Sequence, residues 1–510
     1  MKCLQELKRF SVKEESVGFE LRELGELTEL GGELTIYGLE KVATMEEAKE
    51  AKLVCKRDLK NLTLDCGTDL QHSDVLDALQ PHPNLEALVI RNHGGTRGPS
   101  WLCGDIGIKM LGSLHLEDVS WGTLPPFGQL LHLTSLKLIS ISVLHEIRPG
   151  LGGVTDNSFV NLKRIVLLRL PEFVEWVGGA NAQSFSRLEC IRCKDCPKLC
   201  VVPFLECSVS YPNLSNFVVD NCPKLSLPPM PHTPTLTSYI VRVGSTKLSY
   251  DDEGLVIDGY SGELAWDNLH EVERINIRDV SHIPLPELSK LKVFMYLVID
   301  EESSMQSMAL LSELTCLTDL RLVDCENLTV DGFNPLITVN LNYLCVYNTG
   351  NCRSRSISAD LFSELVVART SLSLPAGSFQ LEHLKVDCIS AVLVAPICSI
   401  LAATLRYLRF SFDQRAESFT GEEDGALQLL TSLYYIKFED CPNLPCLPQV
   451  LHSLPSLRIL DIERCPQIRS LPKGGFPTPL TVTVTGCSRE LEEQLWKLQA
   501  TNPDVDVCIC

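Results

Sequence analysis

Residues 433–472, LYYIKFEDCPNLPCLPQVLHSLPSLRILDIERCPQIRSLP, contain the pattern L-x-x-L-x-L-x-x-C twice, from Leu433 to Cys441 and from Leu457 to Cys465. Residues three and five positions after the first leucine point to the same side of a short strand, because side chains alternate along a strand. Their apolar side chains can therefore be buried between successive coils. The cysteine at the ninth position lies where the chain turns inward, and it can hydrogen-bond backbone groups of that turn.

The same pattern recurs along the whole chain. Other clear copies begin at Leu188, Leu214 and Leu317, and weaker copies bring the total to roughly twenty, most of them starting 22 to 29 residues apart. Two wider gaps, at 236–272 and 341–381, predict an insertion in the first and a degenerate repeat in the second. That degenerate repeat would run through the following residues: Phe362, Leu365 and Val367.

Repeats of this length predict an α/β leucine-rich-repeat solenoid, or horseshoe. A parallel β-sheet would form its concave face, and irregular loops and short helices its convex face. Six cysteines are expected to have a structural role as the repeat ladder: Cys196, Cys222, Cys325, Cys441, Cys465 and Cys487.

We expect residues 1–510 to form a single solenoid of roughly twenty repeats. Within it, residues 1–58 form distinctive amino-terminal repeats with a helix near 44–58, which begins at a plausible capping box. Residues 59–487 form the repeat array, and residues 488–510 a carboxy-terminal cap helix and tail.

Composition narrows the functional classes. The 510 residues include 45 Lys and Arg against 65 Asp and Glu, a formal net charge of −20, which argues against binding to nucleic acid. The charged first residues do not form an export signal, so we expect a cytoplasmic protein. We also expect the 22 cysteines to be reduced thiols.

The amino-terminal region has a specific order of motifs. LGEL at 24–27 leads into GELTIYGLEKV at 32–42 and EAKEAKL at 47–53, followed by LDALQPHPNL at 76–85, PSWL at 99–102 and LPPFGQL at 124–130. This order resembles the leucine-rich-repeat region of plant coiled-coil NB-ARC disease resistance proteins, which are intracellular immune receptors. The resemblance implies a defence role, in which the repeats sense a pathogen effector or a guarded host protein and restrain a nucleotide switch.

The chain departs from those receptors because it contains no G-x-x-x-x-G-K-[ST] phosphate loop. The nucleotide binding of those receptors therefore does not extend to this chain, and we expect no cofactor. The implied partners are proteins: an effector, a guarded host protein, or an NB-ARC region in cis or in trans. An alternative is an F-box-type substrate receptor or another repeat scaffold, although no F-box region precedes the repeats.

Other motifs that suggest chemistry have simpler explanations. Cys190, Cys193, Cys196 and Cys200 have the spacing of an iron–sulfur motif, but the repeat places Cys190 on the opposite side of its strand from Cys193. The uncharged segment 388–405 favours a buried convex helix over a membrane span. With no catalytic signature present, we expect a non-enzymatic protein without catalytic or metal residues.

Two sets of residues are candidates for binding. Aromatic and basic residues gather on the expected concave face toward the carboxyl end, where they either bind a protein or only stack between strands. This first set is Tyr343, Tyr347, Tyr407, Arg409, Phe412, Tyr435 and Lys437. The second set is a candidate basic patch for an acidic partner: Arg164, Arg169, Arg192, Lys194, Arg274 and Arg278.

Overall fold

The structure is a computed structural model of the 510-residue chain. It describes residues 4–13, 20–67, 73–103, 107–147, 159–177, 185–205, 211–227, 229–260, 264–269, 271–279, 291, 295–300, 306–311, 314, 316–325, 327–332, 340–349, 356–372 and 379–509.

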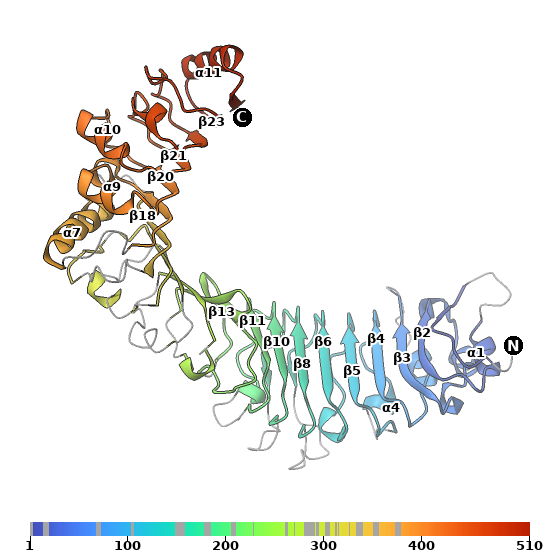
Figure 1. Ribbon diagram of the computed structural model, residues 1–510. Helices are drawn as coiled ribbons and strands as arrows, with labels where there is room; N and C mark the ends of the chain where they lie inside the picture. Colours follow the sequence, from blue (N-terminus) through green and yellow to red (C-terminus); the bar gives the residue numbers. More distant parts are fainter. Residues whose placement is uncertain are drawn as a thin grey trace. The chain divides into compact units, whose positions relative to one another are not determined.

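The chain forms two compact units, one of Met1–Asp252 with Gly262–Asn268, the other of Glu253–Ser261 with Leu269–Cys510. In the first unit, ten strands pair in parallel in chain order, and an eleventh, β13, pairs antiparallel with β12 (Figure 1). These strands are β1 (Arg9–Ser11), β2 (Gly32–Tyr37), β3 (Leu59–Asp65), β4 (Ala87–Arg91), β5 (Ser113–Glu117), β6 (Ser135–Ile139), β8 (Arg164–Leu168), β10 (Cys190–Lys194), β11 (Asn216–Asp220), β12 (Ser238–Val243) and β13 (Thr246–Asp251).

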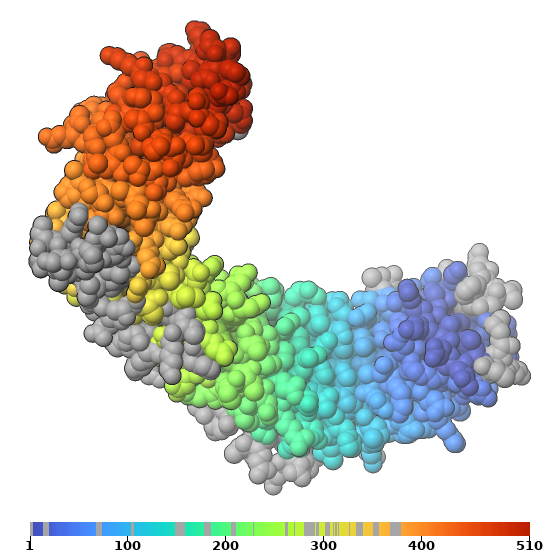
Figure 2. Space-filling view, in the orientation of Figure 1, coloured from blue at the N-terminus to red at the C-terminus, as the bar shows by residue number. Residues whose placement is uncertain are grey.

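In the second unit, every described strand pairs in parallel with the next. These strands are β14 (Gly254–Asp258), β15 (Arg274–Arg278), β16 (Tyr296–Asp300), β17 (Asp319–Val323), β18 (Tyr343–Tyr347), β19 (His383–Val386), β20 (Tyr407–Ser411), β21 (Tyr435–Glu439), β22 (Ile459–Glu463), β23 (Leu480–Thr485) and β24 (Val505–Ile509). Figure 2 shows the coils as successive bands of colour within each unit, as expected when each repeat contacts its neighbours along the chain.

Short helices lie in the segments that return from one strand to the next. The first unit contains α1 (Leu21–Glu26), α2 (Met45–Lys49), α3 (Ser73–Ala78), α4 (Ser100–Cys103) and the 3-10 turns η1 (Leu39–Lys41), η2 (Leu53–Cys55), η3 (Phe127–Gln129), η4 (Pro203–Leu205) and η5 (Trp266–Asn268), with a small sheet of β7 (Glu146–Ile147) and β9 (Glu175–Trp176). The second contains α7 (Ile357–Leu372), α8 (Ile389–Val392), α9 (Ala395–Leu401), α10 (Gly421–Leu427), α11 (Arg489–Thr501), η6 (Met308–Leu311) and η7 (Leu451–Ser453).

The core is built by residues that occupy equivalent positions in successive strands. Leu408 and Phe410 of β20 pair in register with Ile436 and Phe438 of β21, and all four side chains are fully buried. The rings of Phe410 and Phe438 stack with their centroids 5.7 Å apart. Burial of these apolar side chains is the main favourable term that holds each coil against the next. The predicted parallel sheet of a leucine-rich-repeat fold is confirmed.

Most thiols of the repeat ladder contact two backbone carbonyls. One carbonyl lies two residues earlier in the same coil, and the other lies in the preceding coil. The Sγ atom of Cys465 lies 3.3 Å from the Glu463 carbonyl oxygen and 3.6 Å from the Phe438 carbonyl oxygen of the preceding coil. The same two-carbonyl arrangement recurs at Cys196, Cys325, Cys441 and Cys487, while Cys222 contacts the carbonyl of Asp220. A small thiol thus satisfies carbonyl groups that would otherwise be buried without a partner.

The residue just before each ladder position has a left-handed backbone conformation. Asp440, with φ 50°, and Asn221, with φ 54°, are examples, and Asn and Asp tolerate this region better than other non-glycine residues. The same conformation occurs at Asn92, Asp118, Ser140, Arg169, Asp195, Asp279, Asp324, Phe412 and Arg464. This sharp bend ends these strands at the same point of the repeat.

Two segments differ from the sequence-based expectations, and one expected insertion is present. Residues 357–372 form the helix α7 and not a degenerate repeat strand. The insertion expected between residues 236 and 272 is present, and it forms an antiparallel hairpin of β12 and β13. The tail after α11 is the strand β24, which pairs with β23, because its alternating Val505 and Val507 side chains are buried.

Two expected helices are present. In α2, the Thr44 hydroxyl accepts a hydrogen bond from the Glu47 backbone N–H at 3.2 Å, but the helix ends at Lys49, well before residue 58. The uncharged segment 388–405 forms α8 and α9, whose Ile397, Cys398, Ile400 and Leu401 side chains are buried. No helix in the described ranges is long and apolar enough to cross a membrane. The single array of roughly twenty repeats stays a prediction.

Replacing Leu460 with alanine should destabilise the second unit by about 3 kcal/mol, because the side chain is fully buried and its removal leaves a cavity. Ile459→Ala, one residue earlier on the other side of β22, is the matched control and should cost less than about 1 kcal/mol. Thermal unfolding and hydrogen exchange of the β21–β23 amides measure both changes. Equal losses would contradict the assignment of the two sheet faces.

Buried ladder thiols should resist alkylation. The hydrogen bond with Cys465 and burial raise the pKa of Cys441, so little reactive thiolate forms. Cys55 and Cys316 are exposed and serve as internal controls. Iodoacetamide labelling, followed by peptide mass spectrometry, should modify the exposed pair first and Cys441 only after addition of guanidinium. Labelling of Cys441 at the rate of Cys316 would contradict its burial.

Candidate functional site

The seven aromatic and basic residues singled out from the sequence lie together on the second unit. They occupy the face of the sheet opposite the buried side chains, which we call the open face. Tyr343 and Tyr347 come from β18, Tyr407 and Arg409 from β20, Phe412 from the turn after β20, and Tyr435 and Lys437 from β21. Arg409 is exposed and the other six are half-buried.

An aromatic row crosses four neighbouring strands of the open face. The His383 ring of β19 lies between Tyr343 and Tyr407, with centroid distances of 5.7 Å and 4.2 Å, and is nearly parallel to Tyr407. The row continues to Tyr435, whose ring centroid is 5.9 Å from that of Tyr407. Burial lowers the pKa of His383, which favours a neutral ring in this stack at pH 7. His383 was missed because residues were selected by type, although it occupies the same repeat position as the tyrosines.

A second aromatic pair lies nearer the carboxyl ends of the strands. The rings of Tyr347 and Phe412 stack at 5.5 Å, and the Lys385 ammonium lies 4.3 Å from the centre of the Tyr347 ring. Phe412 has a φ of 64°, a conformation that is unfavourable for a bulky side chain. Its neighbours therefore hold it in a strained position beside the open face.

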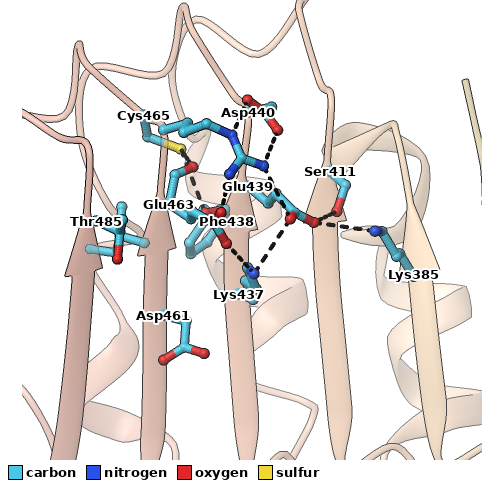
Figure 3. Close-up of polar contacts among 12 residues, drawn as sticks. Lys385, Ser411, Lys437, Phe438, Glu439, Asp440, Asp461, Glu463, Cys465 and Thr485 are labelled. Atoms are coloured by element: carbon cyan, nitrogen blue, oxygen red, sulfur yellow. Dashed lines mark hydrogen bonds and ion pairs between the residues drawn. The ribbon is translucent and has the colours of Figure 1, made fainter. Parts of the chain in front are cut away.

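Beside the aromatic rows lies a network of alternating charges, shown in Figure 3. Glu439 contacts the Lys385 ammonium at 3.2 Å and the Lys437 ammonium at 3.4 Å, and it accepts a hydrogen bond from the Ser411 hydroxyl at 2.9 Å. Lys437 also pairs with Glu463 at 2.5 Å. The side chains of Lys385, Lys437 and Glu439 are only 15–16% exposed, so solvent screens these contacts weakly.

Arg464 completes this network at its edge. Its guanidinium lies 2.6 Å from Asp440 and 3.4 Å from Glu439, and it also contacts Glu463. Three cations, including Lys385 and Lys437, thus face three carboxylates, and the network is neutral overall. The acidic members were not predicted, because interface composition points to aromatic and basic side chains on this face and not to carboxylates.

The network lowers the pKa of its central carboxylate, Glu439. Burial alone would raise the pKa of Glu439, but the hydrogen bond from Ser411 and the charge of Lys385 outweigh it and hold the pKa at about 2. The Tyr435 hydroxyl donates to Asp461 at 2.7 Å, and burial together with this bond raises the pKa of Tyr435 well above its usual value. These side chains therefore keep one charge state across the physiological pH range.

Two guanidiniums of this region lie on rings. The Arg321 guanidinium carbon is 4.6 Å from the centre of the Tyr343 ring, and that of Arg409 is 5.2 Å from the centre of the Tyr435 ring. Both arginines are exposed. Cation–π contact of this kind fixes the orientation of the guanidinium and leaves its N–H groups available for hydrogen bonds.

The predicted basic patch is divided between the two units. Arg164, Arg169, Arg192 and Lys194 belong to the first unit, and Arg274 and Arg278 to the second. Within the first unit, Lys194 pairs with Asp220 at 3.4 Å, Arg192 donates to Asn216 and Arg169 to Ser140. The patch as one binding surface stays a prediction.

The described residues contain no group of three or more His, Cys, Asp or Glu side chains that could hold a metal ion. Cys193 and Cys196 are buried, whereas the Cys190 thiol faces Asn216 at 3.7 Å.

The open face of β17–β22 thus offers stacked rings, two oriented guanidiniums and a neutral charge network. This combination suits the recognition of another macromolecule.

Glu439→Gln should destabilise the second unit by about 2 kcal/mol at pH 7, the scale of a charge-assisted hydrogen bond. The folded-state pKa of about 2 lies below the ordinary value of 4.5, so the carboxylate stabilises the fold above pH 4.5. This contribution is lost as the pH falls toward 2. The difference between the wild type and the variant should shrink over the same range in urea unfolding.

Glu493→Gln is the control for this experiment, because Glu493 is exposed on α11. It should change stability by less than about 0.5 kcal/mol at every pH. A difference between Glu439→Gln and the wild type that stays constant from pH 7 to pH 2 would contradict the role of the ionised carboxylate.

Comparisons with known proteins agree with the repeat pattern. A family model described as R13L1/DRL21 LRRs matches residues 21–141. The putative disease resistance protein RGA1 of Solanum bulbocastanum is 32% identical over 207 residues, which cover 40% of this chain and 20% of that relative. The putative disease resistance RPP13-like protein 1 of Arabidopsis thaliana is 27% identical over 206 residues, which cover 35% of this chain and 19% of the relative. These alignments span about a fifth of each relative's length.

Solved structures show only a weak likeness. The plant peptide hormone receptor RGFR1 in complex with RGF2 matches 100% of this chain and 97% of its own at 12% identity, with a TM-score of 0.35. A repeat protein of Leptospira interrogans matches 98% and 99% at 13% identity, with a TM-score of 0.36. TM-scores this low do not bear on function. The strand register and the sequence relatives place the chain among leucine-rich-repeat proteins, and its sequence is similar to the repeat region of plant disease resistance proteins.

Proposed function

We propose that this chain is the recognition region of a plant defence receptor, and that it binds a protein partner on the open face of β18–β21. The observation that carries the proposal is the aromatic row from Tyr343 through Tyr407 to Tyr435, flanked by Arg409. Tyrosine and arginine anchor protein interfaces because they cover a large area and still form hydrogen bonds.

Preorganisation supports the same proposal. The stacked rings and the ion pairs of Glu439 restrain side chains that would otherwise lose rotamer freedom on binding. A surface already held in its bound arrangement loses less entropy when a partner arrives. Stacking and binding are therefore compatible, since the stacked tyrosines are only half-buried.

The role in defence is inferred from the relatives, which are disease resistance proteins. We infer that the partner is a pathogen effector or a guarded host protein, and that the chain acts inside the cell without catalysing a reaction. In this proposal the repeats also restrain an NB-ARC nucleotide switch, which acts in cis or in trans. The match over residues 21–141 supports the link to resistance proteins.

A comparison of captured partners in plant leaf tissue tests the proposal. The tagged full chain is expressed with and without pathogen challenge, next to a Tyr407→Ala/Tyr435→Ala variant. A protein enriched by the wild type should fall by at least about tenfold with this variant, because loss of even one hot-spot residue typically costs about 2 kcal/mol or more. Quantitative mass spectrometry of the captured proteins measures the change.

The matched control is Thr481→Ala/Thr483→Ala, which changes two residues of the same face on β23, two strands from Tyr435. It should keep the captured protein. Tyr407→Phe/Tyr435→Phe preserves the rings and separates stacking from hydrogen bonding by the hydroxyl groups. Partner capture that is unchanged by the alanine variant, or equally reduced by the control, would refute binding at this row.

A further inference from the structure

We infer that exposed arginines on the open face of the second unit bind carboxylates of an acidic, extended protein segment. The arginines are Arg274, Arg321 and Arg409, which we call the arginine stripe. This inference rests on the proposed function and specifies the chemistry of its partner: aspartate or glutamate side chains spaced along a strand-like segment.

The arginines of the stripe differ from several other cations of the sheet, which pair with carboxylates of neighbouring strands. In the first unit, Arg91 pairs with Glu117 at 2.9 Å and Lys194 with Asp220 at 3.4 Å, each across to the next strand. In the second unit, Lys385 and Lys437 share Glu439.

Each arginine of the stripe lies over a tyrosine ring, whereas the cations described above contact a carboxylate. Arg274 lies 5.1 Å from the centre of the Tyr296 ring, Arg321 lies over Tyr343 and Arg409 over Tyr435. Among the described residues, none of the three forms an ion pair. Their positive charge is thus oriented by a ring and is available to a partner.

Strand register sets the spacing of the stripe. Arg321 pairs with Cys345, Cys345 with Lys385 and Lys385 with Arg409, so Arg321 and Arg409 lie in one row, three strands apart. At about 4.8 Å per strand, this separation is about 14 Å between backbones. An extended peptide covers about 13 Å in four residues. Acidic residues four apart in an extended segment therefore match the row.

The surroundings favour carboxylates over the phosphates of a nucleic acid. The chain has a net charge of −20, which opposes a long polyphosphate more strongly than a short peptide with two or three carboxylates, and three separated guanidiniums are few for a nucleic-acid backbone. Stacking of bases also needs free ring faces. His383 and Tyr407 are parallel at 4.2 Å, which leaves no room for a base between them. A short acidic peptide needs only a few contacts with oriented arginines.

The test measures fluorescence anisotropy of a labelled peptide of about nine residues, with glutamate at every fourth position and serine or glycine between. The purified full chain is titrated at low ionic strength, with the same peptide carrying glutamine and with labelled oligothymidylate as comparison probes. The variant is Arg321→Gln/Arg409→Gln. The matched control is Arg91→Gln/Arg242→Gln, which removes the same charge from the open face of the first unit, where these arginines pair with Glu117 and Asp220.

We expect the glutamate peptide to bind the wild type and to lose about tenfold in affinity with Arg321→Gln/Arg409→Gln, against about twofold or less with the control. The glutamine peptide should not bind. Thermal unfolding of the variants confirms that each is folded. The inference is overturned if the glutamate peptide does not bind the wild type, if both variants weaken it equally, or if oligothymidylate binds through the same arginines more tightly.

This assay needs only the purified chain and a synthetic peptide, so its failure is distinct from a failure to capture a partner in leaf tissue. If a partner is captured but the peptide does not bind, the open face recognises a protein by other chemistry. If the peptide binds through the stripe while tissue capture does not depend on Tyr407 and Tyr435, the acidic site stands without the proposed aromatic interface.

Discussion

The rest of this molecule depends on the parallel register of its strands. Each repeat strand buries two alternating side chains, and these must meet the buried side chains of the next strand. Leu408 and Phe410 must meet Ile436 and Phe438 for either pair to be shielded from water. Because side chains alternate across a strand, fixing the inward residues also fixes the outward ones. A shift of one residue would turn the core outward, so the same register governs the core and the open face.

The open face inherits its order from that register. Equivalent residues of neighbouring strands lie about 4.8 Å apart, a distance at which rings stack and opposite charges pair. The aromatic row through His383 and the charges around Glu439 are both consequences of this spacing. Where a ring replaces the carboxylate, as at Arg321 and Arg409, a cation is left for a partner. The balance between internal pairing and available charge is thus set strand by strand.

Much of the fold could be predicted because the spacing of apolar residues and cysteines indicates the repeat. The prediction failed where this spacing is ambiguous: Phe362 and Leu365 fit a weak repeat, but they also lie three apart on one side of a helix, and they are buried in α7. At the turn after β20, Asp413 takes the ladder position and accepts backbone N–H groups of Ile389, Arg415 and Ala416. A pattern that looks only for cysteine or asparagine cannot find it.

The sequence by itself determined the repeat, the residues that face inward and the side of the sheet on which Tyr343, Tyr407, Arg409 and Tyr435 lie, because these follow from local periodicity. Only the tertiary structure decided which outward side chains neutralise one another. Lys437 is paired with Glu439 and Glu463, whereas Arg409 lies on Tyr435. These contacts depend on the rotamers of long side chains from several strands, and no spacing within one repeat specifies them.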